Sequence, residues 1–531
     1  MKLFKKAICM LAVAVVIVSV SVLPVAAVSS VPYKGYSYDS KGYDIDAPVG
    51  YVPDRTYFST DMGMKDKFYN VYDMQIFEDE IYIADSHAES TDADDTTHDR
   101  IVVLDKDYQY VRQYTQFVDK KTGEKYEIKN PRGVFVTEDE IFVCCDVQTT
   151  QINDNGESEV FYDGYVLIGD HKGNLTRMIT NPAEYSPVVE SNNFRPFSIV
   201  EDKSGYLYVR AQDELNGLMV FSEEGQFLQY FGANKVSLTF ELVVQQMWKK
   251  IFSREAADTM QKTVPTEMSG IFVDDEGFLY TTTGSMTIDE NLRLRKLNAA
   301  GDNILGYDPN ATLEKSYGDR FVSWHQDVWN TSFVDCVVDE NDVIAVLDQK
   351  YGRVFLYDQQ SVLLSVFGYL EVNPLVKNGS TTIPVAIEKL GDDYLVLDRG
   401  QKAIVTYRPT DFIEKLLTAN QYYMKGWYIE GEPYWQEVLK YDSNNVRAYA
   451  AIGKSLLEQG KYEESLEYLK KGYDRTSYSL AYSEFRREYI RANYWWLIPS
   501  IVVGVFLIIK LFKLIRKLLG FKDEKTDITF R

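Results

Sequence analysis

Six segments of the chain share one pattern of polar and apolar positions. Residues 78–83 read EDEIYI and residues 138–143 read EDEIFV: an acidic turn leads into the alternation typical of a β-strand. A third apolar run usually follows, such as RIVVLD at 100–105. Related strand–turn–strand segments occupy 72–85, 132–146, 195–210, 269–284, 334–348 and 383–398. The pattern predicts six similar units of three or four strands each.

Repetition of this kind predicts a mainly β fold, a six-bladed β-propeller over residues 72–410. A four-stranded blade has two apolar faces and cannot bury both alone, so its neighbours have to cover them. The ring closes without a free edge if the lead-in, residues 28–71, adds an outer strand to the last blade. We expect that strand within residues 33–48, YKGYSYDSKGYDIDAP, which have no partner in sequence.

After the sixth unit the apolar period changes to that of a helix. Residues 449–472 carry apolar and small residues at helical spacing, and a weaker copy lies 34 positions earlier. Residues 411–493 are therefore predicted to form a small domain of paired helices, with 477–494 covering the last pair.

Both ends of the chain are apolar segments beside basic residues. Residues 1–27 are typical of a secretory signal peptide, with an uncleaved anchor as the alternative. Residues 494–513 are long enough to cross a bilayer, and 514–531 form a basic tail. The expected membrane anchors are Trp495 and Trp496 outside, and Lys510, Lys513, Arg516 and Lys517 inside. This predicts a single-pass plasma-membrane protein whose bulk is extracellular and whose short C-terminal tail is cytoplasmic.

Charge and cysteine content narrow the choice of partners. A formal net charge of −22 argues against nucleic acid, whose phosphates would be repelled. Cys144, Cys145 and Cys336 do not form a disulfide or zinc-binding framework, and we expect small buried hydrophobic side chains there. The predicted partners are the membrane bilayer and a membrane or extracellular protein.

Charged residues recur where the predicted second strands end and the third strands begin. Asp85, Asp348 and Asp398 end second strands, and Arg100 and Arg353 follow shortly after. They could bind a cation or a substrate at one face of the propeller. We favour a structural role, in which carboxylate–backbone or carboxylate–arginine contacts fix each blade corner.

A second group of charged residues lies at the start of the inner strands. Asp73 and Asp335 begin such strands, where side chains can face the central channel. With Arg132 and Arg195 at neighbouring blades, they are predicted to line a polar ligand-binding mouth. The alternative is that these charges are merely solvated.

The acidic loop at 85–99 is a further candidate metal site. Asp92, Asp94 and Asp95 offer oxygen ligands of the kind that Ca²⁺ prefers. The loop lacks the spaced ligands and the glycine of an EF-hand, so a solvated loop is the alternative. No other cofactor is expected.

The repeated unit resembles the NHL repeat. Pro131-Arg132-Gly133 matches the start of that repeat, and the strand-ending aspartates and the arginines after them match its end; the fourth unit lacks the aspartate, and Asp146 stands one place late. The helical part resembles a tetratricopeptide repeat at Tyr449, Gly453, Gly460 and Ser465. The first resemblance implies a six-bladed propeller, and the second implies TPR-like helix pairs.

The order of segments is similar to that of a clostridial group of NHL-repeat membrane proteins. PYKGYSYD, VPTEMSGIFVDDEGFLYTT and the final WW-plus-basic span carry this resemblance. It implies a role as an accessory or ligand sensor beside a sugar-type ABC transporter.

Two functions from different classes follow. The first is a non-enzymatic, membrane-anchored extracellular binding or scaffold protein. The alternative is a metal-dependent lactonase or hydrolase of the gluconolactonase type, whose Glu, Asn and Asp metal ligands cannot be matched on these strands. Three or more carboxylates and amides converging in the channel would favour the hydrolase, whereas an apolar and aromatic lining would favour binding.

Overall fold

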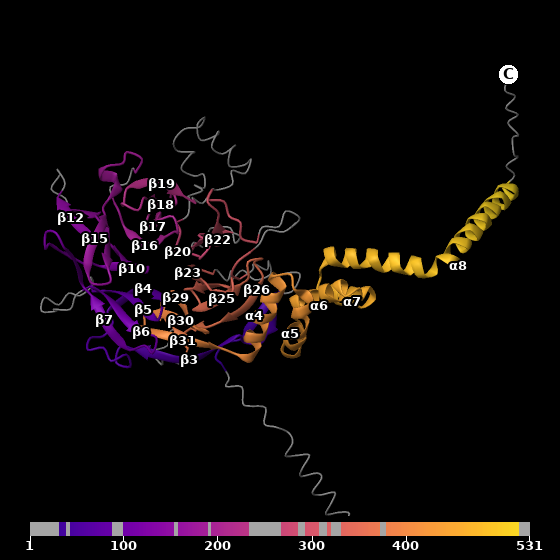
Figure 1. Ribbon diagram of the computed structural model, residues 1–531, viewed down its shortest axis with the longest axis horizontal. Coiled ribbons are helices and arrows are strands. Elements are labelled where there is room, and N and C mark those ends of the chain that lie inside the picture. The colour runs from indigo at the N-terminus through magenta and orange to yellow at the C-terminus, as the bar shows by residue number, and fades with distance from the viewer. Residues whose placement is uncertain are drawn as a thin grey trace, which may run out of the picture. The chain divides into compact units, whose positions relative to one another are not determined.

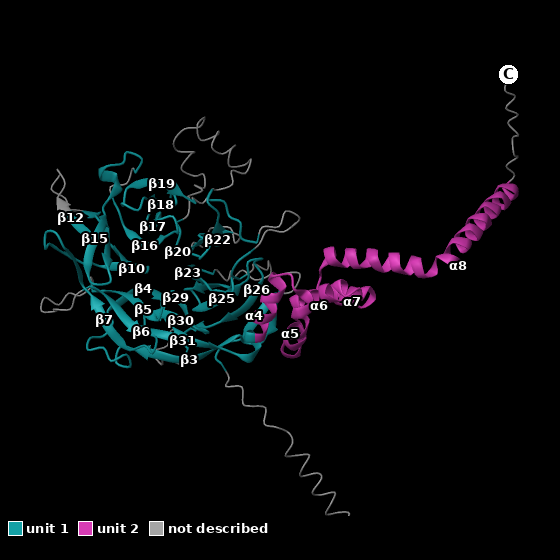
Figure 2. Ribbon diagram, viewed as in Figure 1, with its two compact units in different colours: residues 1–414 teal, residues 415–531 magenta. Residues whose placement is uncertain are grey.

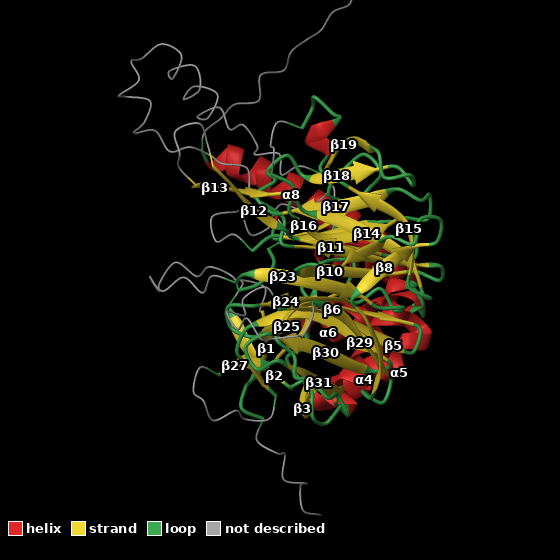
Figure 3. Cartoon of the chain, turned by 90° about the vertical axis from the view of Figure 1, so that its left-hand side faces the viewer, coloured by secondary structure: helices red, strands yellow, loops and turns green. Residues whose placement is uncertain are grey.

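The computed structural model describes residues 31–38, 43–87, 99–152, 158–189, 193–232, 267–284, 292–306, 316–319, 331–371 and 379–519. The chain divides into two compact units, Met1–Glu414 and Lys415–Arg531 (Figure 2). The first unit consists mainly of strands (Figure 3), with one short 3-10 helix at Pro182–Glu184, and the second unit consists of helices.

Each blade begins with its innermost strand and continues outward. Blade 1 contains β4 (Asn70–Phe77), β5 (Glu80–Ser86), β6 (Arg100–Asp105) and β7 (Tyr110–Tyr114). Blade 3 contains β16 (Pro196–Glu201), β17 (Leu207–Ala211), β18 (Leu218–Phe221) and β19 (Phe227–Phe231). Blade 4 has the described strands β20 (Gly270–Val273), β21 (Leu279–Thr282) and β22 (Leu294–Leu297). Blade 5 contains β23 (Phe333–Val338), β24 (Ile344–Asp348), β25 (Arg353–Tyr357) and β26 (Leu363–Phe367).

Blade 2 is extended beyond the repeat. Its strands β10 (Pro131–Val136), β11 (Glu140–Cys145), β14 (Tyr165–Asp170) and β15 (Asn174–Ile179) follow the common order. The chain before the blade adds β8 (Gln116–Asp119) and β9 (Lys125–Glu127) outside β15. A separate hairpin, β12 (Gln148–Ile152) and β13 (Ser158–Tyr162), is inserted between β11 and β14.

The lead-in supplies the outer strand of blade 6, but from a later segment than expected. Blade 6 consists of β29 (Pro384–Leu390), β30 (Asp393–Asp398), β31 (Ala403–Pro409) and β3 (Tyr51–Phe58). The expectation for 33–48 is wrong, because β1 (Gly35–Tyr38) and β2 (Asp44–Ala47) pair with each other as a hairpin. An outermost strand tolerates Pro53 and the irregular register after it.

The six innermost strands form a closed ring. Each of β4, β10, β16, β20, β23 and β29 contacts the next, and β29 returns to β4 (Figure 1). Together with the six sheets, this ring is a mainly β, six-bladed propeller, and the predicted fold class is confirmed. The channel bounded by the ring is where the predicted ligand mouth has to lie.

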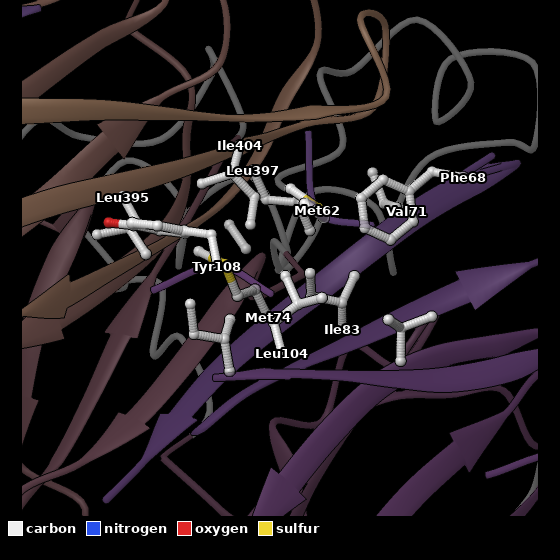
Figure 4. Packing of buried hydrophobic residues seen from close by; sticks show 13 residues of the cluster. Met62, Phe68, Val71, Met74, Ile83, Leu104, Tyr108, Leu395, Leu397 and Ile404 are labelled. Carbon is white, nitrogen blue, oxygen red and sulfur yellow. The ribbon is translucent and has the colours of Figure 1, made fainter. Parts of the chain in front are cut away.

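The core lies between adjacent blades, and this explains the repeated hexamer. On β5, Ile81 and Ile83 pack against blade 6, whereas Tyr82 and Ala84 pack against blade 2. Alternate side chains of a strand point to opposite faces, so a strand covered on both faces has to be apolar throughout. Figure 4 shows the first of these clusters, in which Ile83 lies with Leu395 and Leu397 of blade 6.

The helices of the second unit repeat with the expected period of 34 residues. They are α4 (Asp411–Met424), α5 (Tyr428–Tyr441), α6 (Val446–Glu458) and α7 (Tyr462–Lys471). Gly426 and Gly460 end the first helix of each pair with the same φ of 75°, which favours glycine. Gly453 lets α7 approach closely, because a Cβ there would lie 2.6 Å from Leu469. The Ser465 hydroxyl donates to the Gly453 carbonyl over 2.7 Å.

One long helix, α8 (Arg475–Leu518), continues from the helix pairs into the apolar segment. It is the one described helix that is long and apolar enough to cross a membrane, with a mean hydropathy of 2.3 over its most apolar window. No residue of that window is buried. All six predicted anchor residues lie on α8, and Trp495 is 70% exposed. The predicted signal, 1–27, lies outside the described residues.

Candidate functional site

Two blade corners have the same arrangement of a buried carboxylate. Asp85 accepts hydrogen bonds from the Tyr69 and Asn70 amides over 2.8 and 3.1 Å and pairs with Arg100 at 2.9 Å. Asp348 accepts from the Ser332 amide over 3.0 Å and pairs with Arg353 at 2.8 Å. Each carboxylate thus ties the chain that leads into the inner strand to the third strand of its own blade.

The other two corners differ. Asp398 accepts from the amides of Ile383 (2.8 Å) and Gly400 (2.9 Å) and has the Gln401 side chain as its partner at 2.9 Å. Asp146, the aspartate one place late, pairs with Arg195 at 3.0 Å and with Arg132 at 3.6 Å. Two arginines predicted for the channel mouth therefore meet at one corner carboxylate.

Asp73 and Asp335 occupy equivalent places and join neighbouring blades. Each follows a shift in register between the first two strands of its blade. The Asp73 carboxylate accepts from the Val134 amide of blade 2 over 2.9 Å, and the Asp335 carboxylate accepts from the Ile387 amide of blade 6 over 2.8 Å. Both carboxylates lie in the channel wall, and each is hydrogen-bonded to the inner strand of the next blade.

Glycines make the corresponding contact at two other blade junctions. A Cβ on Gly133 would lie 2.4 Å from the Phe197 carbonyl oxygen, and one on Gly270 would lie 2.6 Å from the Val334 carbonyl oxygen. Real Cβ atoms essentially never approach so closely. The glycine of the Pro-Arg-Gly motif is therefore needed for direct contact between inner strands.

Two charged residues in the channel wall were not predicted. Glu388 on β29 accepts a hydrogen bond from the Ile76 amide of blade 1, so it also bridges blades. Arg210 on β17 donates to the Ser198 hydroxyl over 3.3 Å and lies 3.6 Å from Glu267. Glu388 stands four places after the start of β29, and a charged residue inside an inner strand is its only sequence signal; nothing comparable marks Arg210.

Desolvation controls the titration of the channel carboxylates. It raises the pKa of Asp73 to about 6 and, reinforced by neighbouring carboxylates, raises the pKa values of Asp335 and Glu388 well above their ordinary range. Three carboxylates are thus close enough to repel one another. Among the residues that the structure describes, however, no three acidic, histidine or cysteine side chains are grouped to hold a metal ion.

At the end of the channel where the inner strands begin, arginines surround two aromatic rings. The Arg132 and Arg399 guanidinium carbons lie 3.8 and 5.0 Å from the centre of the Tyr72 ring. Those of Arg132, Arg195 and Arg210 lie 5.5, 5.7 and 5.1 Å from the centre of the Phe197 ring. We call these residues the arginine–aromatic belt: Tyr72, Arg132, Arg195, Phe197, Arg210 and Arg399.

The belt extends the predicted mouth. It includes Arg132 and Arg195 but adds Arg399 of blade 6 and Arg210 of blade 3. Tyr72 and Phe197 stand at the register shifts of their inner strands, where the ladder opens and the side chain turns away from it. Asp73 and Asp335 lie one step deeper in the same channel.

A polar cavity of about 630 Å³ lies beside blades 1 and 2, and Asp99, Asn130 and Asp146 are among its lining residues. The Asp99 carboxylate accepts from the Asn130 amide over 2.7 Å. The Asn130 side chain in turn donates to the Asp146 carbonyl over 2.7 Å. The candidate calcium ligands Asp92, Asp94 and Asp95 lie outside the described residues, so the acidic loop stays a prediction.

Comparison with known proteins gives no family. No family model matches the chain, and no curated protein matches it. Similar solved structures include a catalytically inactive virginiamycin B lyase from Staphylococcus aureus, with 9% identity over 65% of this chain and 97% of that chain and a TM-score of 0.34. The major allergen of Malassezia sympodialis has 11% identity over 65% and 92%, with a TM-score of 0.35. A luciferin-regenerating enzyme has 10% identity over 68% and 96%, with a TM-score of 0.35. At these TM-scores the likenesses carry no argument about function.

Proposed function

We propose that this protein is a non-enzymatic, membrane-anchored binding module that recognises its ligand at the mouth of the propeller channel. The observation that carries this proposal is that the carboxylates of the channel bind backbone amides, whereas the arginines of the mouth lie against aromatic rings. Asp73, Asp335 and Glu388 are each held by a backbone amide of the next blade. The mouth, in contrast, gathers arginines around aromatic rings, which is recognition chemistry.

The helix pairs offer a second recognition surface in this proposal. Their 34-residue period, the matching glycines Gly426 and Gly460 and the close approach at Gly453 support a TPR-like identity. The sequence resemblance supports NHL-like blades, the clostridial type and a place beside a sugar-type ABC transporter. Trp495 at one end of the span and the basic Lys510–Lys517 stretch at the other support an extracellular bulk.

A metal-dependent lactonase is the second candidate, and one observation favours it. Asp73, Asp335 and Glu388 lie in one channel and influence each other's protonation. Converging carboxylates were the feature expected of the hydrolase. Both oxygens of Asp73 accept backbone amides, from Met74 and from Val134 over 2.9 Å each, and this competition weighs against a metal shared by the three carboxylates.

Co-purification tests the binding role. The full chain is extracted from membranes in mild detergent and its partners are identified, and the same preparation is assayed with D-glucono-1,5-lactone and Ca²⁺ or Mn²⁺. We expect transporter subunits to co-purify and the lactone to hydrolyse at the background rate. The Asp335→Asn variant shows whether any lactone hydrolysis depends on the carboxylates of the channel. Lactone turnover that this substitution abolishes, without any co-purified membrane protein, would refute the proposal.

Protease added to intact cells tests the topology. We expect cleavage within residues 72–410 and protection of an epitope placed after residue 519. Cells opened with detergent provide the control, in which the epitope is also lost. An intact propeller in sealed cells, with cleavage only after opening, would place the propeller in the cytosol.

A further inference from the structure

We infer that the arginine–aromatic belt binds a small organic anion through a carboxylate or phosphate group. This inference rests on the proposed binding function and names the chemistry of its ligand. It concerns the mouth of the channel and not the carboxylates deeper in its wall.

Two arginines of the belt have guanidinium N–H groups that form no hydrogen bond with the described residues. No described residue forms an ion pair or side-chain hydrogen bond with the Arg399 guanidinium, which lies over the Tyr72 ring. Arg132 is only 13% exposed, yet its buried Nε has no hydrogen-bond partner, and its carboxylate neighbour Asp146 stands 3.6 Å away. A guanidinium carries five N–H donors, and leaving them unused away from water is costly. An anion with several oxygens would satisfy them.

The aromatic rings leave those donors available. Tyr72 holds Arg132 and Arg399 against its ring, and Phe197 lies among Arg132, Arg195 and Arg210. Stacking on a ring fixes the guanidinium plane by a cation–π contact and uses none of its N–H groups. The edge of a fixed guanidinium then matches the two oxygens of a carboxylate or phosphate. The belt is thus already arranged before a ligand arrives.

The local charge favours an anion although the whole chain is acidic. Four guanidinium groups meet the carboxylates Asp146 and Glu267 and the exposed Asp213. Asp146 is shared by Arg132 and Arg195, so it does not neutralise both. The mouth thus gathers four guanidinium groups although the chain has a net charge of −22, and a local cluster of positive groups attracts anions.

Matched probes test this inference on the full chain in detergent micelles. D-glucuronate, D-glucose 6-phosphate and D-glucose differ mainly in the charged group, and calorimetric titration measures the binding of each. We expect binding of at least one charged probe and none of glucose. The stronger of the two charged probes tells a carboxylate ligand from a phosphate ligand. Absence of binding by both at about 10 mM would overturn the inference.

Substitutions locate the binding at the belt. Arg399→Gln removes a guanidinium that holds no ion pair, so the fold should persist, and we expect the affinity for the charged probe to fall about tenfold or more. Arg132→Gln should act in the same way. The control is Arg408→Gln. Arg408 is an exposed arginine on β31 that pairs with Asp54 at 3.3 Å, and its removal should leave the affinity for the charged probe unchanged. Equal affinity in all three variants would refute the site.

The inference and the proposed function fail separately. Lactone turnover or a cytosolic propeller would end the proposed function, while anion binding lost in Arg399→Gln would still stand. An extracellular protein that co-purifies with transporter subunits but binds neither charged probe would end only the inference.

Discussion

At the level of single residues, neighbouring inner strands of the channel wall are joined in two different ways. Neighbouring inner strands meet through a carboxylate at Asp73 and Asp335, and through direct backbone approach at Gly133 and Gly270. A carboxylate spans a wider gap and satisfies an amide that would otherwise be unpaired. Protonation of such a carboxylate therefore makes the stability of the propeller depend on pH.

The pH dependence of stability should show this titration. Because the pKa of Asp73 is raised to about 6 in the folded protein, the folded state holds the proton more tightly than the unfolded chain. Its stabilising contribution is complete below about pH 4 and is lost as the pH rises through about 6, a loss on the order of 1–3 kcal/mol. Thermal unfolding between pH 4 and 7 measures it.

Asp73→Asn keeps an acceptor oxygen for the Val134 amide and should flatten that decline. Asp79→Asn is the control, because Asp79 lies exposed on the turn that follows, paired with Lys106. A decline in Asp73→Asn as steep as that of the unsubstituted protein would show that Asp73 does not titrate in this range.

The glycine contact predicts a steric effect. Gly133→Ala places a Cβ 2.4 Å from the Phe197 carbonyl oxygen and should cost about 2–4 kcal/mol, because backbone on both sides has to move. Ser204→Ala, on the exposed turn after β16, is the control and should cost less than about 1 kcal/mol. Denaturant unfolding of both variants makes the comparison, and equal stabilities would contradict the steric account.

At the level of elements, sequence pattern identified the central strands well. β5 and β11 are covered on both faces, so packing requires the continuous apolar runs that the pattern detects. The outer strand β3 has half-exposed residues and a proline, and β8 and β9 belong to a loop insertion. Such strands form because a sheet edge is available to them, and a local pattern does not contain that information.

The closing strand should nevertheless be essential. Tyr51 on β3 is 1% exposed, with its ring centre 4.7 Å from that of Phe367 and 5.0 Å from that of Tyr394. Tyr51→Ala should lower the stability of the propeller by about 3 kcal/mol or more, because it leaves a cavity where the ring closes. Tyr43→Ala, 45% exposed in the lead-in, is the control. Melting temperatures that fall equally would mean that β3 is not a critical closure.

The candidate site was predicted only in part for a related reason. Arg132 and Arg195 stand beside a recognisable strand start, so sequence position marks them. Arg210 and Arg399 reach the same mouth from second strands or the turn after them, in blades 3 and 6. Only closure of the ring brings residues so distant in sequence to one place.

At the level of the whole molecule, the exposed apolar stretch of α8 is compatible with a single membrane span, and its removal tests where the protein resides. A chain ended after Asn493 keeps the helix pairs and the first turns of α8 but loses the apolar window. We expect this truncated protein in the culture medium and the full chain in the membrane fraction, measured by fractionation and immunoblot. Retention of the truncated chain in membranes would instead indicate an uncleaved anchor at residues 1–27.

The unbroken course of α8 has a mechanical consequence. Its 44 residues extend over about 66 Å along the helix axis, with no loop between its first turn and its last. Pro499 is the one position inside it where the backbone ladder is interrupted, so bending concentrates there. Tilting of the turns before Pro499 would therefore bend the helix at that residue and change the angle of the apolar half that follows it.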